Sequence, residues 1–147
     1  MNKIISKNRK AYFDYIVIEE YVAGIVLVGT EVKSVKANKV SLLGSFCYIE
    51  ENEIFIKSMD IAVNKETSNV LNHNPTRVRK LLMKKKEIVR LHESITQKGL
   101  TVVPLEIFLS DTGFIKIKIG LVKGKKLFDK RESLKAKDLD RDLQRIK

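Results

Sequence analysis

The stretch FIKIKIGLV, residues 114–122, indicates the class of fold. Three isoleucines alternate in it with Lys116 and Lys118, and successive side chains of a β-strand point to opposite faces of a sheet. One face of this segment is therefore apolar and the other is cationic. We predict a half-buried strand that packs its isoleucines on a core and leaves its lysines in solvent.

Five further runs are similarly rich in β-branched and aromatic residues, and turn-forming residues bound them. Runs that are neighbours in the chain pair most simply as antiparallel hairpins. The three predicted hairpins join residues 12–20 with 21–29, 40–50 with 53–61, and 100–109 with 114–122. In the first of them, Ala23 and Gly24 lie near the turn.

Two segments predict helices. The shorter one has Thr30 in the N-cap position, Glu31 in the positive first turn and Asn38 as a stop. The longer one is predicted from Asn74 to Gly99, because apolar residues recur there at helical spacing. Its apolar stripe is Val78, Leu81, Leu82, Ile88, Leu91 and Ile95, and its basic face is Arg79, Lys86 and Arg90.

Six short strands with interposed helices make the fold mainly β with helices (α+β). A chain of 147 residues is one ordinary domain in length. We predict an antiparallel six-stranded barrel of the oligonucleotide-binding type, partly or fully closed, with two to three helices.

The charge of the chain indicates a polyanionic partner. Twenty-nine Lys and Arg against 18 Asp and Glu give a formal net charge of +11. Such an excess attracts nucleic acid first and an anionic membrane surface second. The longest apolar runs are far shorter than the roughly 20 residues that cross a bilayer, and no signal peptide is recognisable. We expect a cytoplasmic protein that does not insert into a membrane.

Residues that would support catalysis are scarce. His73 and His92 are the two histidines and stand in no metal-binding motif, and Cys47 is the single cysteine. We interpret Cys47 as a small buried apolar residue and each histidine as an ordinary surface or partly buried side chain. A small hydrolase that uses Glu31 or His92 would lack a paired base or a metal. We therefore predict no enzyme activity, no metal and no cofactor.

Positive charge gathers in four segments, where Lys and Arg would neutralise phosphates. These are KNRK at residues 7–10, RVRKLLMKKK at 77–86, KIK at 116–118, and KGKK with DKR at 123–131. Candidates for stacking on unpaired bases are Tyr12, Phe13, Tyr15 and Phe128. Each feature alone also fits a solvated surface or a core, but their co-occurrence in one small domain favours nucleic acid.

Three motifs then stand in one order: GTEVKS at residues 29–34, RKLL at 79–82 and KGKKLFDKR at 123–131. With the segments around them, from about Asn8 almost to the end, they resemble the SsrA-binding protein (SmpB) family. The resemblance implies a barrel that binds the tRNA-like domain of transfer-messenger RNA. It also implies delivery of that RNA, with elongation factor Tu, to ribosomes stalled on messages without a stop codon, and no catalysis by the protein itself.

The resemblance divides the chain into a barrel, residues 1–123, and a basic tail, residues 124–147, that is disordered or partly helical when free. The tail is expected to enter the empty mRNA channel of the ribosome near the decoding centre. Its predicted ribosome contacts are Phe128, Asp129, Lys130, Arg131, Lys135, Arg141, Arg145 and Ile146. The free protein is expected to be a monomer.

The resemblance assigns a second set of residues to RNA contact or to shaping the RNA-binding surface. They are Asn8, Arg9, Tyr15, Glu31, Lys33, Ser34, Arg79, Lys80, Leu82, Lys116, Lys118, Gly124, Lys125 and Lys126. Glu31 and Asp129 would orient bases or accept hydrogen bonds from RNA, whereas Arg131 and the lysines would meet phosphates.

Three positions depart from the family pattern. Val22 stands where an acidic residue is frequent, Phe13 where His is frequent, and Phe128 where Tyr or His is frequent. Stacking survives the aromatic changes, but hydrogen bonding does not. The tail is also shorter than in many relatives. A general single-strand or tRNA-binding module without a ribosomal task stays open as the alternative, and it would not require the DKR motif.

Overall fold

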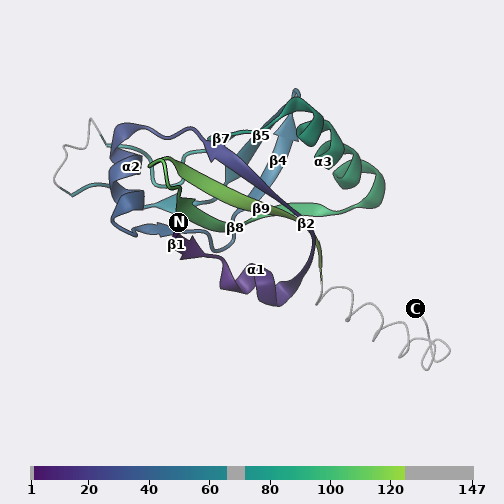
Figure 1. Ribbon diagram of the computed structural model, residues 1–147, viewed down its shortest axis with the longest axis horizontal. Helices are drawn as coiled ribbons and strands as arrows, with labels where there is room; N and C mark the ends of the chain where they lie inside the picture. The colour runs from purple at the N-terminus through teal and green to yellow at the C-terminus, as the bar shows by residue number, and fades with distance from the viewer. Residues whose placement is uncertain (1, 66–71, 125–147) are drawn as a thin grey trace.

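The computed structural model describes residues 2–65 and 72–124, which form strands and helices around one barrel (Figure 1). The elements are β1 (Lys3–Lys7), α1 (Arg9–Asp14), β2 (Tyr15–Ile25), α2 (Gly29–Lys36), β3 (Val40–Ser41), β4 (Phe46–Glu50), β5 (Glu53–Lys57), β6 (Asp60–Ile61), β7 (Arg79–Leu82), α3 (Lys85–Lys98), β8 (Thr101–Leu109) and β9 (Ile115–Gly124). The predicted tail lies outside the described residues, except that Gly124 is the last residue of β9.

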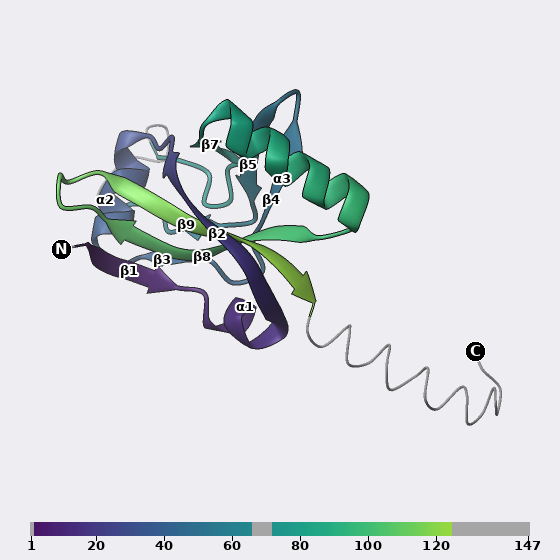
Figure 2. The same ribbon diagram turned by 45° about the vertical axis from the view of Figure 1, so that its right-hand side comes forward.

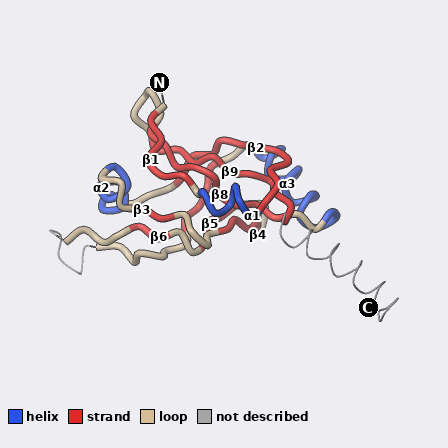
Figure 3. Tube along the Cα trace, turned by 90° about the horizontal axis from the view of Figure 1, so that it is seen from below, coloured by secondary structure: helices blue, strands red, loops and turns tan. Residues whose placement is uncertain are grey.

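Six antiparallel strands close into a ring in the order β8, β4, β5, β7, β2, β9, because β9 also pairs with β8. The predicted six-stranded barrel with helices is thereby confirmed. β1 adds to the outside of this ring by pairing with β8. The short strands β3 and β6 form a separate two-stranded ribbon (Figure 3).

The barrel interior holds the main apolar core. Inward side chains of the strands, among them Ile54, Ile56, Leu81, Ile117 and Ile119, are at most 1% exposed. The core also includes Val35 of α2 with Ile88 and Leu91 of α3. Helix α1 instead packs on the other side of β8, in a second cluster of Ala11, Val103, Leu105 and Val122. Strand β8 is therefore covered on both faces, while β2 and β7 have an outer face without a covering helix (Figure 2).

Two of the three predicted hairpins are confirmed, namely β4 with β5 and β8 with β9. The first one is wrong. Residues 9–14 form helix α1, which begins because the Asn8 side chain accepts a hydrogen bond from the Ala11 amide at 3.2 Å. Ala23 and Gly24 make no turn, and β2 runs straight through them to pair with β9 on one edge and β7 on the other.

The long helix predicted from Asn74 is wrong in its first half. Helix α3 begins at Lys85, and Arg79–Leu82 is a strand. Arg79 and Leu81 are buried while Leu82 is exposed, which is the alternation of a strand, so Arg79 is not part of a basic helix face. Asn74 caps a turn by accepting a hydrogen bond from the Thr76 amide at 3.0 Å. A segment of four residues is too short for its apolar pattern to distinguish the two-residue period of a strand from the 3.6-residue period of a helix.

The short predicted helix is confirmed as α2, with a correction at its start. Val28 occupies the N-cap position, and the Glu31 carboxylate accepts the hydrogen bond of its amide at 2.9 Å. Thr30 is not the N-cap, and its hydroxyl lies 2.8 Å from Nδ1 of His73. Asn38 follows the helix with a positive φ of 63°, as expected of a residue that ends one.

Candidate nucleic-acid interface

An exposed surface lies on the outside of the barrel where β2 runs between β7 and β9. The register places Gly24 opposite both Leu82 and Lys116, and Val22 opposite Lys118. We call the surface formed by Val22, Gly24, Lys80, Leu82, Lys116 and Lys118 the outer sheet face. Val22 and Leu82 are 52% and 53% exposed. An apolar centre is thus flanked by lysines, which suits a ligand with both phosphates and less polar groups.

Most of these lysines have only weak partners within the chain. Lys118 Nζ lies 3.8 Å from a Glu20 oxygen and 3.7 Å from a Glu106 oxygen, and Lys80 pairs with Glu53. The Lys118 contacts are long for ion pairs, and an exposed pair such as Lys80–Glu53 contributes about 0–1 kcal/mol. Phosphates would therefore compete readily for the ammonium groups.

The α1 side of this surface carries an aromatic side chain. The Lys7 ammonium lies 5.1 Å from the centre of the Tyr12 ring. Burial, together with the negative charges of Glu106 and Glu20, raises the pKa of Tyr12. Its hydroxyl therefore stays protonated at neutral pH and remains a hydrogen-bond donor.

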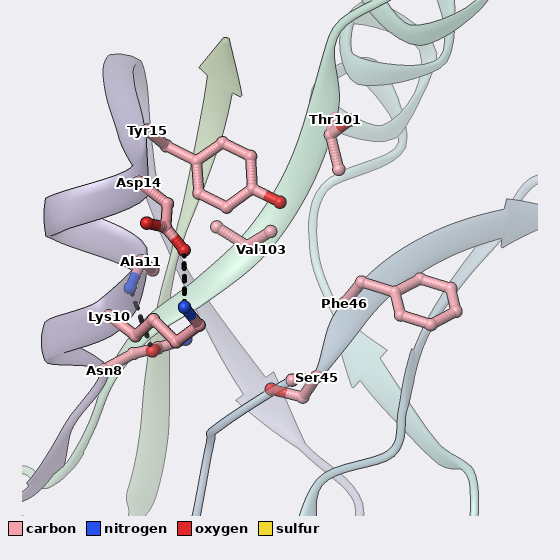
Figure 4. Close-up of a pocket in the computed structure, with 10 residues that line it drawn as sticks. Asn8, Lys10, Ala11, Asp14, Tyr15, Ser45, Phe46, Thr101 and Val103 are labelled. Carbon is pink, nitrogen blue, oxygen red and sulfur yellow. Dashed lines mark hydrogen bonds and ion pairs between the residues drawn. The ribbon is translucent and has the colours of Figure 1, made fainter. Parts of the chain in front are cut away.

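A pocket of about 280 Å³ opens between α1, the segment before β4, and β8 (Figure 4). Tyr15 of β2 and Phe46 of β4 line it, and the Tyr15 ring points towards Val103 and Thr101 while the Phe46 ring points away from them. Lys10 and Asp14 form an ion pair of 3.1 Å at its edge. Tyr15 pairs with Gly124 in the sheet, so the pocket adjoins the point where the predicted tail begins.

Asn8 lines this pocket and links the three segments around it by hydrogen bonds. Its amide nitrogen donates to the carbonyls of Leu42 at 3.3 Å and Pro104 at 2.9 Å, and its oxygen accepts from the Ala11 amide. The side chain is buried and all of these hydrogen bonds are within the fold. Two roles were predicted for Asn8, direct RNA contact and shaping of the RNA-binding surface. Because the side chain is buried, this conformation permits only the second.

A buried charged cluster joins α2 to the segment around β7. Glu31 is fully buried, and it forms ion pairs of 2.6 Å with Arg77 and with Arg79. Arg79 is equally buried and donates to the carbonyls of Met59 at 2.6 Å and Pro75 at 3.1 Å. Each charge is thus paired and hydrogen-bonded, as a buried charge requires.

The cluster keeps its charges at neutral pH. Burial alone would raise the pKa of Glu31, but hydrogen bonds from Arg77, the Val28 amide and Arg79 outweigh it, so the pKa lies below the ordinary value. Burial lowers the pKa of Arg79, yet a guanidinium remains protonated throughout the physiological range. Glu31 and Arg79 are both fully buried, so of their two predicted roles this conformation fits the shaping of the RNA-binding surface and not direct contact with RNA.

The predicted site residues divide into two groups by exposure. Asn8, Glu31, Ser34 and Arg79 are buried, and Ser34 donates to the Ala62 carbonyl at 2.7 Å. Those with accessible surface are Arg9, Tyr15, Lys33, Lys80, Leu82, Lys116, Lys118 and Gly124. Lys125, Lys126 and every predicted ribosome contact from Phe128 to Ile146 lie outside the described residues.

Two residues of the candidate site were not predicted from the sequence. Arg77 shares Glu31 with Arg79, and Phe46 is among the residues that line the pocket of Tyr15. The two-residue spacing of Arg77 and Arg79 would have placed them on one side of an extended segment, had that segment been interpreted as a strand. No local signal identifies Phe46, because its partner residues are distant in sequence.

Cys47 and His92 are placed as predicted, with His92 exposed on α3, whereas His73 is more deeply buried than predicted. Cys47 is buried in the core as a free thiol, and burial raises its pKa. His73 is buried between Thr30 and the Ile61 carbonyl, 2.9 Å from its Nε2. Within residues 2–65 and 72–124 no group of three or more potential ligands is arranged to hold a metal, and no helix is long and apolar enough to cross a membrane.

Comparison with known proteins extends over nearly the whole chain. The sequence model of the SmpB protein family matches residues 5–147. The chain belongs to the SmpB family. SsrA-binding proteins of Fusobacterium nucleatum and Cytophaga hutchinsonii are 50% and 45% identical to it, over 97% and 96% of this chain and 95% and 92% of theirs.

A solved structure supports the same assignment of fold. It is described as "tmRNA-SmpB: a journey to the center of the bacterial ribosome" and superposes with a TM-score of 0.71 at 42% identity. The match covers 95% of this chain and 94% of that one. The SmpB resemblance predicted from the GTEVKS, RKLL and KGKKLFDKR motifs is confirmed.

Proposed function

We propose that this chain binds the tRNA-like domain of transfer-messenger RNA and acts with it in trans-translation, the rescue of stalled ribosomes. The observation that carries the proposal is the SmpB family match over residues 5–147. The outer sheet face supports it physically. Lys116 and Lys118 suit phosphates, and the exposed Val22 and Leu82 suit bases or sugars.

The proposal includes the remaining parts expected of this family. Residues 124–147 act as a basic tail that occupies the empty mRNA channel near the decoding centre. The protein arrives as a monomer in a complex with transfer-messenger RNA and elongation factor Tu, in the cytoplasm, and performs no catalysis. Gly124, Lys125 and Lys126 form the hinge and phosphate contacts where the tail leaves β9.

A binding experiment tests the RNA partner. Purified protein is titrated against the tRNA-like domain of the cognate transfer-messenger RNA and against bulk tRNA at several salt concentrations. We expect tighter binding to the tRNA-like domain that persists as salt rises, because shape and base contacts add to phosphate attraction. Equal binding that collapses together with salt would reduce the protein to a generic RNA-binding barrel.

A tagging experiment tests the ribosomal task. Replacing Asp129 and Lys130 by Ala is expected to leave affinity for the tRNA-like domain nearly unchanged and to abolish tagging of nascent chains in a reconstituted translation system. A general single-strand or tRNA-binding module would show no distinctive loss from these replacements. Full tagging by the double variant would contradict the proposed role of the tail.

A further inference from the structure

A second basic surface lies at the start of α3. Lys84 stands at the N-cap position, Lys85 and Lys86 in the first turn and Arg90 in the second, and all four are exposed. We call these four residues the α3 cluster. In the part of the chain that the structure describes, none of them forms an ion pair. Lys80 and Lys118 of the outer sheet face, by contrast, have carboxylate partners.

The helix gains no stability from these cations. The first turn of a helix carries partial positive charge, so lysines there are disfavoured by the dipole as well as by one another. Glu87 is the acidic residue of the first turn, and its carboxylate accepts a hydrogen bond from the Lys84 amide at 3.1 Å. The charge of the cluster thus remains for an anion from outside the chain.

A groove connects the α3 cluster with the outer sheet face. It has a volume of about 330 Å³ and is lined by residues of β5, β7 and the start of α3, which lie side by side in Figures 1 and 2. Its cations are Lys80 and Lys85, and Glu53, the partner of Lys80, is its acidic residue. Its apolar residues are Leu81, Leu82, Met83 and Ile88. Lys80 belongs to both surfaces, so the cationic path continues from the sheet onto α3.

We propose that the α3 cluster and this groove bind the phosphate backbone of a double-stranded RNA segment. The inference rests on the proposed function and extends it to a second surface. Residues 84–90 include no aromatic side chain, and Val89, 49% exposed, is the apolar residue among the cations. Such a face offers no ring for base stacking, whereas an A-form stem is bound through its shape and its phosphates.

The test uses the full-length protein and three probes: a short blunt-ended RNA duplex, the tRNA-like domain, and poly-glutamate. One variant replaces Lys84, Lys85 and Lys86 by Gln. The matched control, K36Q/K39Q/K57Q, removes the same charge from exposed lysines that belong to neither surface. Circular dichroism confirms that each variant keeps its fold before binding is compared.

We expect the α3 variant to lose about tenfold or more in duplex affinity at low salt. Its slope of log affinity against log salt should flatten by about 2–3, since each phosphate contact contributes about 0.7–0.9 to that slope. The control should change the slope by less than about 1. Equal losses in both variants, or poly-glutamate binding as tight as duplex binding, would show a response to net charge alone and overturn the inference.

The two proposals fail separately. If the wild-type protein selects the tRNA-like domain over bulk tRNA and the α3 variant binds the duplex as the wild type does, the α3 inference is wrong and the proposed function stands. If the wild-type protein shows no such selection, the proposed function itself is wrong, whatever the duplex result.

Discussion

The two faces of strand β7 differ in burial and in their partners, although their residues alternate along the same four positions. Arg79 and Leu81 point inwards and are 0% and 1% exposed, whereas Leu82 points outwards and is 53% exposed beside Lys80. The inward arginine holds Glu31 of α2 in a buried ion pair. The outward pair belongs to the surface that we assign to RNA. Four consecutive residues therefore form part of the core on one face of the strand and part of the proposed RNA-binding surface on the other.

This difference shows why a sequence motif does not define one role. Residues of GTEVKS and RKLL meet in space, but Glu31 and Arg79 meet in the interior and hold the orientation of α2 against the barrel. Changing them should alter the free energy of unfolding first and RNA binding only through it. Changing Leu82 should alter RNA binding and leave the free energy of unfolding nearly unchanged. The following predictions test that separation.

The largest effect is expected from Glu31→Gln. The substitution leaves Arg77 and Arg79 without their buried partner, and removing one member of a buried pair typically costs about 3–5 kcal/mol. Urea unfolding followed by circular dichroism measures the change. Glu53→Gln is the matched control, because the Lys80–Glu53 pair is 41% and 47% exposed and should contribute at most about 1 kcal/mol. Similar losses in both variants would contradict the distinction.

The buried pair also predicts a pH dependence. The pKa of Glu31 in the folded state is below its ordinary value of 4.5, so its stabilising effect is complete above that value and is lost as the pH falls through the folded pKa. The difference in unfolding free energy between wild type and Glu31→Gln should therefore be constant near neutral pH and shrink in acid. Urea unfolding of both proteins at a series of pH values measures it. A difference that does not shrink would exclude an ionised Glu31 as its source.

Much of the barrel was predictable because its strands carry a clear period of two. The alternation in FIKIKIGLV places Ile117 and Ile119 inside and two lysines outside, as the structure has it. The four residues of β7 carry no such signal, since Leu81 and Leu82 fit a helical stripe equally well. Pairing with β2 and β5 determines that this segment is a strand, and the local sequence carries no information about that pairing.

The candidate site was predictable to the extent that its residues stand in motifs. Lys80, Leu82 and Lys116 were identified and are brought together by the register of β7, β2 and β9. The burial of Glu31 was not predictable, because an acidic residue in the first turn of a helix is ordinarily solvated. It is buried here because two arginines from a distant segment neutralise it.

Leu82→Glu is expected to affect RNA binding with little effect on stability. The change places a negative charge at the exposed centre of the outer sheet face, next to where phosphates would bind. We expect a loss of about tenfold or more in affinity for the tRNA-like domain, which corresponds to about 1.4 kcal/mol. The unfolding free energy should change by about 0.5 kcal/mol or less, as for other surface substitutions.

The control for this variant is Ile4→Glu. Ile4 is 54% exposed, close to the value for Leu82, but it lies on β1 outside the barrel ring. The Ile4→Glu variant changes the net charge by the same amount but leaves the outer sheet face intact. Its affinity for the tRNA-like domain should therefore fall by about twofold at most. Equal losses from both substitutions would mean that the outer sheet face has no special part in binding.

The smallest effect, with opposite signs for stability and binding, is expected from Gly24→Ala. A Cβ at Gly24 would lie 3.3 Å from the Leu82 Cβ, and because a Cβ moves only with its backbone, strand β7 must shift by a few tenths of an ångström at Leu82. Alanine is favoured over glycine in a strand, so stability should rise by about 0.5 kcal/mol while affinity for the tRNA-like domain falls by a few fold. Gly29→Ala is the control, since a Cβ there meets nothing within 4 Å. If Gly24→Ala binds as tightly as Gly29→Ala, the position of Leu82 on the outer sheet face is not what the RNA reads.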